Sequence, residues 1–108
     1  MHEQLIADLM ALKQSIVRAN NDVYTAAHEL IVAKDALRAK EDSVTVEGLI
    51  DGKNAEIRAS QLRQYTVIER QEVAEAEDYL ENAKTTLSNL RTELQINLAL
   101  VELVKGVA

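Results

Sequence analysis

Residues 5–37 read LIADLMALKQSIVRANNDVYTAAHELIVAKDAL, and apolar side chains recur through this stretch at alternating steps of four and three. This heptad spacing is typical of a helix that packs against another helix along one narrow stripe. The positions of the stripe are Leu5, Leu9, Leu12, Ile16, Ala19, Val23, Ala26, Leu30, Ala33 and Leu37. The stretch therefore predicts one long helix with a single apolar seam.

The second half of the chain repeats the pattern at Val73, Ala76, Leu80, Ala83, Leu87, Leu90, Leu94, Asn97, Val101 and Val104. Two of the glycines, Gly48 and Gly52, lie between the two stretches. We therefore predict an all-α fold, a long antiparallel two-helix hairpin of the coiled-coil type, as a single domain over residues 1–108. The predicted first helix covers residues 2–43, the turn 44–54 and the second helix 55–105.

The register of the hairpin follows from the sizes of the seam residues. If paired residue numbers add to 106, Ala19 faces Leu87, Ala26 faces Leu80 and Ala33 faces Val73. Small side chains opposite large ones let two facing layers interdigitate at normal interior density. At the turn, Asn54 is the predicted N-cap of the second helix, with Asp51 as the alternative.

The composition limits the partners. Twelve Lys and Arg against eighteen Asp and Glu give a net charge of −6, which argues against general binding to nucleic-acid phosphates. No stretch approaches the roughly 20 apolar residues of a membrane span. The chain contains no cysteine, which is compatible with a reducing compartment. We expect a cytoplasmic protein that binds neither membranes nor nucleic acid.

The sequence offers no set of residues for catalysis. His2 and His28 are isolated, and the chain has no His-Glu-x-x-His pattern and no glycine-rich phosphate loop. Glu69 occupies a seam position, where we interpret it as one half of an ion pair with Lys40 at the edge of the seam rather than as a metal ligand. We therefore expect no enzymatic activity, no cofactor and no metal.

Apolar residues outside the seam point to self-association. The first helix carries a second apolar line, and the C-terminal end of the second helix is apolar on nearly all sides. Since such faces need cover, we predict a helical bundle formed by a homo-oligomer, with a dimer as the first expectation. The predicted interface consists of Ile6, Met10, Val17, Tyr24, Ile31, Ile96, Leu98, Leu100 and Leu103. The alternative is a site for a different protein.

Two further groups are candidate partner contacts. The first lies at the turn and consists of Leu49, Ile50, Lys53 and Arg58; the second is acidic and consists of Glu75, Asp78 and Glu81. Each group also has a structural interpretation. The apolar turn residues would cap the end of the seam, and the acidic side chains would keep the helix solvated.

Residues 51–58, DGKNAEIR, resemble a segment of small uncharacterised proteins encoded by phages and prophages, which look like helical hairpins with a DGKNAExR motif at the start of the second helix. The resemblance implies an origin in a mobile genetic element and action inside a bacterial cell. It brings no catalytic residue with it. A functional and a purely structural role of the segment are both open, the structural one using Gly52 in the turn and Asn54 as the cap.

The leading hypothesis is a non-enzymatic, self-associating coiled-coil module, encoded by a phage, that acts by binding protein. One alternative is a small inhibitor of a host defence system, acting through its acidic surface or by sequestering a ligand. Another is an accessory protein of phage recombination or replication, which would contact nucleic acid through Lys53, Arg58, Arg63 and Arg70.

Overall fold

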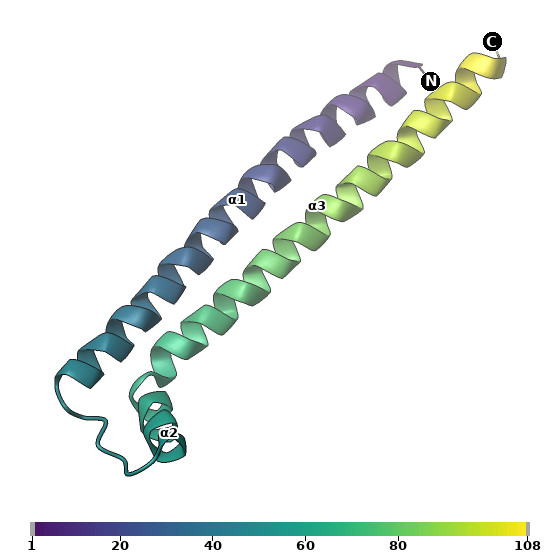
Figure 1. The fold of residues 1–108 in the computed structure, drawn as a ribbon. Coiled ribbons are helices and arrows are strands. Elements are labelled where there is room, and N and C mark those ends of the chain that lie inside the picture. The colour runs from purple at the N-terminus through teal and green to yellow at the C-terminus, as the bar shows by residue number, and fades with distance from the viewer. Residues whose placement is uncertain (1, 108) are drawn as a thin grey trace. The chain divides into compact units, whose positions relative to one another are not determined.

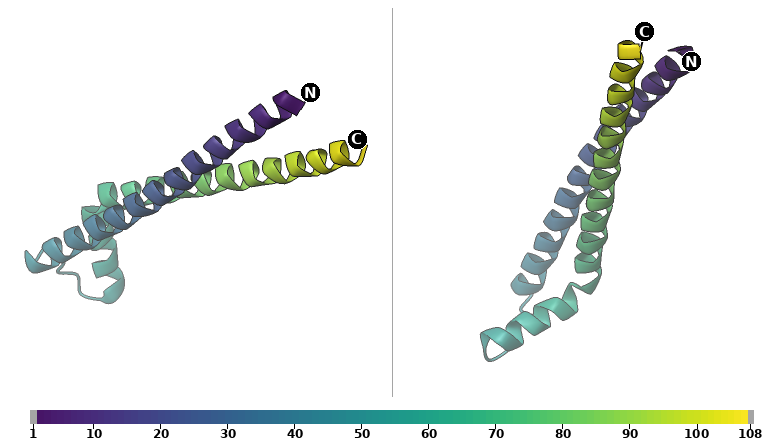
Figure 2. Two further views of the ribbon diagram at one scale, coloured as in Figure 1. Left: turned by 90° about the horizontal axis from the view of Figure 1, so that it is seen from above. Right: turned by 90° about the vertical axis from the view of Figure 1, so that its right-hand side faces the viewer.

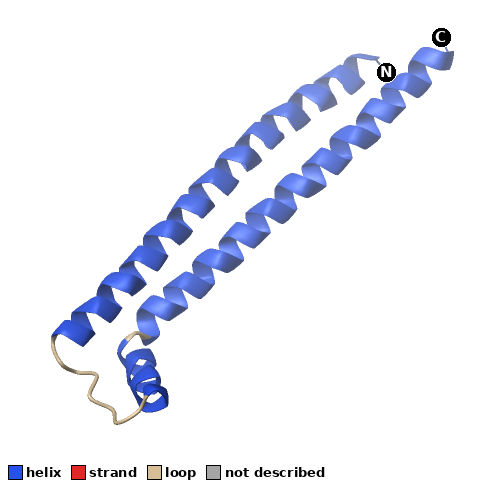
Figure 3. Cartoon of the chain, in the orientation of Figure 1, coloured by secondary structure: helices blue, strands red, loops and turns tan. Residues whose placement is uncertain are grey.

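The computed structural model describes residues 2–107, and every regular element in that part of the chain is a helix. The helices are α1 (His2–Val46), α2 (Ala55–Tyr65) and α3 (Val67–Val107) (Figure 1). Residues 47–54 form the connection between α1 and α2 (Figure 3). The prediction of an all-α helical hairpin is confirmed.

The chain forms two compact units, and each contains an antiparallel pair of helical stretches. The first unit, called the terminal unit, joins Met1–Thr25 with Glu81–Ala108. The second, called the turn unit, is Ala26–Leu80. The division places Thr25 with Glu81 and Ala26 with Leu80, which are pairs of the predicted register. The single domain over 1–108 stays a prediction.

The core of the terminal unit lies on the predicted seam. Leu12, Ala19 and Leu87 are buried, and the other seam positions of this unit are half-buried. Ala19 and Leu87 are a predicted facing pair, and the burial of both agrees with that register. The alternation of four and three thus identifies the buried stripe correctly.

The core of the turn unit contains Ala26 and Val44, together with one polar residue, Thr66. Ala26 and Thr66 have no exposed surface at all. Lys40, which we expected in an ion pair at the edge of the seam, is exposed, and its neighbour Glu41 is half-buried instead. The seam therefore loses its heptad regularity toward the end of α1.

The helix α1 ends three residues later than predicted, in a hydrogen-bonded C-terminal cap. The N–H of Gly48 donates to the carbonyl of Thr45, and the N–H of Leu49 donates to that of Val44, both at 3.1 Å. This is the Schellman arrangement, whose turning residue adopts a left-handed conformation. Gly48 has a φ of +78°, a value that glycine reaches without steric cost. The cap stabilises the helical conformation of residues 43–46, although the helix propensity of these residues is low.

The helix α2 begins as predicted. Asn54 has an extended backbone, and its side-chain oxygen accepts a hydrogen bond of 2.9 Å from the N–H of Ile57. Asn54 is therefore the N-cap of α2, and the alternative prediction of Asp51 as the N-cap is wrong. Asp51 instead bonds to Gln61.

The prediction of one continuous second helix over 55–105 is wrong, because the helix is interrupted at Thr66. Here the backbone has φ −122° and ψ 25°, and the N–H of Thr66 bonds to the carbonyl of Arg63 rather than one residue further back. The Thr66 hydroxyl donates to the carbonyl of Leu62 at 2.7 Å. Figure 2 shows α2 running in a different direction from the start of α3. Ala55 and Ala59 are exposed on α2.

The burial of Ala26 leads to a first prediction. Ala26→Leu inserts three carbon atoms into a filled layer, so the free energy of unfolding in urea should fall by about 1–3 kcal/mol. Ala39→Leu is the matched control, since Ala39 is exposed on the same helix, and it should change stability by less than about 0.5 kcal/mol. Both variants are compared at one protein concentration. Equal stability of the two variants would contradict the close packing at Ala26.

Candidate interaction surfaces

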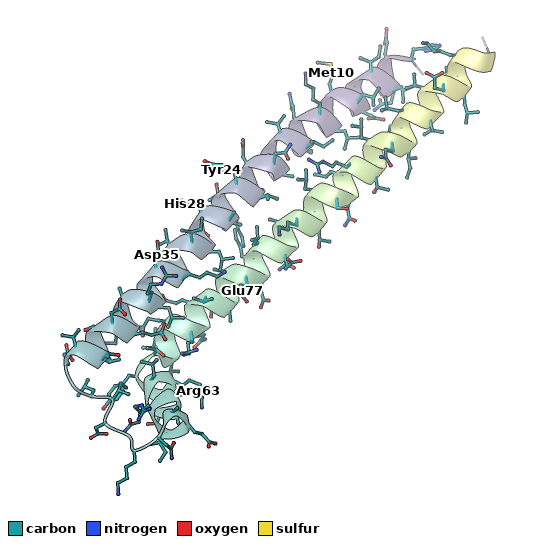
Figure 4. All side chains as sticks on the ribbon, in the orientation of Figure 1. Met10, Tyr24, His28, Asp35, Arg63 and Glu77 are labelled. Carbon is teal, nitrogen blue, oxygen red and sulfur yellow. The ribbon has the colours of Figure 1, made fainter. Side chains whose placement is uncertain are left out.

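A line of large apolar side chains runs along α1 outside the seam, and we call it the α1 line. It consists of Ile6, Met10, Val17, Tyr24 and Ile31, whose exposed fractions range from 52% to 80%, with Tyr24 the highest. Met10 and Tyr24 project from α1 on the side away from α3 (Figure 4). Within the chain, the α1 line is therefore uncovered.

A second exposed apolar set occupies the C-terminal part of α3. It consists of Ile96, Leu98, Leu100 and Leu103, with exposed fractions of 46% to 66%. The seam positions between them, such as Asn97 and Val101, are half-buried. Asn97 lines a groove with Asp8, Ser15 and Glu93, so the seam is polar at its edge there.

Members of the two apolar sets line different grooves, although we predicted both sets as parts of one interface. Leu100 lines a cavity of about 310 Å³ together with Leu5, Asp8 and Val104. Met10 and Val17 line a different groove, of about 330 Å³, in which the other lining residues also belong to α1. Because a helix turns about 100° per residue, Asp8 and Met10 point about 200° apart. The α1 line and Leu100 therefore belong to different sides of the terminal unit.

The turn segment is held together by the side chain of Gln61, a role that no pattern in the sequence indicates. Its Oε1 accepts hydrogen bonds from the N–H groups of Asp51 (3.2 Å) and Gly52 (2.9 Å), and its Nε2 donates to Asp51 Oδ1 (2.8 Å). Arg58 adds a bond of 3.1 Å from its guanidinium to the carbonyl of Gly52. One amide on α2 thus closes the loop onto the helix that follows it.

These contacts assign structural roles to most of the DGKN segment. Asp51 and Gly52 are bound by Gln61, Asn54 caps α2, and the candidate contact Arg58 is bonded to the turn itself. Lys53 is exposed, and the hydrogen bonds and ion pairs within residues 2–107 include none from its side chain.

The two apolar candidates at the turn differ in exposure. Leu49 is exposed, and Ile50 is half-buried. At the end of α1, Val44 is buried, whereas Val46 is exposed. The capping interpretation is thus compatible with the burial of Val44 but does not extend to Val46.

A polar cluster marks the junction of α2 and α3 and replaces the ion pair that we predicted there. Arg70 donates from Nε to the hydroxyl of Thr66 at 2.9 Å, and its Nη2 lies 3.6 Å from Glu41 Oε2. The expected Lys40–Glu69 pair is absent among the described residues. The Arg70–Glu41 pair is partly exposed, so its net contribution to stability is small. Arg70 thus contacts both the buried Thr66 and Glu41 of α1.

The acidic candidates Glu75, Asp78 and Glu81 are all exposed on α3. Glu75 accepts a hydrogen bond of 3.2 Å from Gln71, and Glu81 lies 3.9 Å from Lys84 Nζ. These are contacts between neighbouring turns of one helix, which stabilise it only slightly. The carboxylates thus remain accessible to solvent.

In the described part of the chain, no three His, Cys, Asp or Glu side chains come together as metal ligands. None of the helices between residues 2 and 107 combines the length and apolarity needed to cross a membrane. The chain matches no known protein family, and it matches none of the curated proteins or solved structures with which it was compared.

The Gln61 contacts lead to a second prediction. Gln61→Ala removes the acceptor of the Gly52 N–H, so the exchange of that amide with solvent deuterium should quicken about fivefold, which corresponds to about 1 kcal/mol for one hydrogen bond. Gln64→Ala, at an exposed position of the same helix, is the control and should leave this exchange rate unchanged. An equal rate in both variants would show that Gln61 does not hold the turn.

A third prediction concerns the close approach at Gly52. A Cβ added there would lie 2.6 Å from Ile57 Cγ2 and 3.0 Å from the backbone nitrogen of Arg58. Gly52→Ala should therefore lower the free energy of unfolding by about 1–3 kcal/mol. At Gly106 a Cβ would meet nothing within 4 Å, so Gly106→Ala should be neutral or stabilise by about 0.5 kcal/mol. Thermal unfolding of both variants measures the difference, and equal melting temperatures would contradict it.

Proposed function

We propose that this chain is a non-enzymatic interaction module that self-associates and acts by binding protein. The observation that carries the proposal is the uncovered α1 line, together with the exposed apolar residues at the end of α3. Large apolar side chains that are exposed on a monomer are unfavourable in water and are typically covered by a partner. Helix pairs commonly complete their cores by forming larger bundles.

The accessible surface of the chain supports self-association. It amounts to 8140 Å², whereas a folded monomer of 12.0 kDa exposes about 6,000 Å². The excess, about 2,000 Å², is within the area that one partner buries in an obligate homodimer, about 1,000–2,500 Å². The chain thus has enough unburied surface for a stable interface.

The cellular setting is also part of the proposal. The resemblance of residues 51–58 to the turn segment of phage-encoded hairpins supports an origin in a phage or prophage. The chain would then work in the cytoplasm of a bacterial host. The net charge of −6 would favour a protein partner with a basic surface over nucleic acid.

The proposal predicts the mass in solution. Light scattering at micromolar concentration should give a dimer or a higher multiple of 12.0 kDa. Val17→Glu places a charge in the α1 line and should lower the measured mass, because burying an unpaired carboxylate is costly. Ala39→Glu is the control, since Ala39 is also exposed on α1 but lies beyond the α1 line, and it should keep the oligomer. A monodisperse wild-type monomer would overturn the proposal.

A further inference from the structure

We propose that the second copy binds along the α1 line in antiparallel orientation, with a two-fold axis passing beside Asn20 and Asn21. The inference rests on the proposed function and specifies its interface. In this arrangement the paired residue numbers add to 41. Met10 then faces the partner's Ile31, and Val17 faces the partner's Tyr24.

The spacing of the α1 line is that of a second helix-packing seam. Met10, Val17, Tyr24 and Ile31 follow one another at intervals of seven. Residues seven apart in a helix stay within about 20° of one another, so they form one stripe along α1. Such a stripe is the geometry that another helix with the same stripe can cover along its length.

The α1 line also offers more length than the exposed end of α3. From Ile6 to Ile31 the line extends for about 38 Å along the helix, whereas Ile96 to Leu103 covers about 11 Å. Buried apolar area grows with this length, and the free energy gained grows with it at about 25 cal/mol per Å². The α1 line is therefore the stronger of the two candidates for the contact between copies.

The charges beside the line favour the antiparallel orientation. Lys13 and Lys34 lie one turn from the apolar residues and are exposed. In a parallel, in-register pair each lysine would face its own copy, and like charges facing each other are destabilising. In the antiparallel pair, where the paired residue numbers add to 41, Lys13 faces the partner's His28 and Lys34 faces the partner's Ala7. Neither lysine then faces the same lysine of the other copy, and the ammonium groups stay in water.

The sizes of the side chains favour the same orientation. A parallel pair would place Tyr24 against the partner's Tyr24 and Val17 against the partner's Val17. The antiparallel pair brings each large ring against a small aliphatic residue. Facing layers interdigitate better when large and small residues alternate.

Asn20 and Asn21 would lie where the two copies of α1 cross the axis. Both are exposed, and the hydrogen bonds of the described residues include none from their side chains. Each side-chain amide has both donors and an acceptor, so Asn20 can bond to the partner's Asn21 across the two-fold axis. A polar Asn within an apolar helix contact is known to fix register and oligomeric state. The pair would thus disfavour a slip by one heptad.

Cysteine cross-linking tests the arrangement directly, because the wild-type chain has no cysteine. Single-cysteine variants are treated with a short bismaleimide. Asn20→Cys should cross-link to itself in high yield, since it lies beside the axis. Met10→Cys alone should not, because its two copies would lie about 30 Å apart along the helix. A mixture of Met10→Cys and Ile31→Cys should give a heterodimer product. Ala39→Cys, exposed and beyond the line, measures the background.

Light scattering of the same samples separates the two proposals, and circular dichroism confirms that each variant is helical. A monomer would overturn the proposed function. An oligomer in which Met10→Cys cross-links to itself would indicate a parallel pair and overturn only the present inference. An oligomer in which neither Asn20→Cys nor the mixture of Met10→Cys and Ile31→Cys cross-links above the Ala39→Cys background would also overturn the present inference. The contact between copies would then lie elsewhere.

Discussion

The contact of small side chains on one long helix with large ones on the other is the interaction on which the remaining structure depends. Ala19 and Leu87 are both buried in the terminal unit, and Ala26 is fully buried in the turn unit. In the predicted register, each alanine leaves room for a facing leucine or valine, so that the opposite helix can approach closely. A pair of helices in such contact buries only one stripe of each, so every other apolar residue of α1 and α3 is left to another partner or to water. The exposed α1 line is a direct consequence of this narrow core.

The seam could be derived from the sequence because its signal is periodic and extends over many turns. Its alternating steps predicted which residues of both long helices are buried, and the sizes of Ala19 and Leu87 predicted a register that the structure supports. The N-cap at Asn54 was also predictable, because an Asn directly before a helical stretch has a specific hydrogen-bonding use. These features depend on residues close in sequence or on a repeated pattern.

The features that were missed depend on single residues whose partners are not given by a pattern. The break at Thr66 had a weak local signal in the successive β-branched residues Thr66, Val67 and Ile68, which lower helix propensity. The bonding of Gln61 to Asp51 and Gly52 requires the path of the turn to be known first. The pairing of Arg70 with Glu41 in place of Lys40 with Glu69 accompanies the same break, because Arg70 also donates to the hydroxyl of Thr66.

The hydrogen bonds around the turn also bear on how the chain folds. The Schellman cap, the Asn54 cap and the contacts of Gln61 all join residues at most ten positions apart. Loops of this size close at little cost in chain entropy, and contacts between near neighbours in sequence form fastest. The turn can therefore become ordered before the ends of α1 and α3 meet, and each further layer of the seam then requires only a short additional closure. Sequence separation thus favours an order of assembly that begins at the turn and ends at the termini.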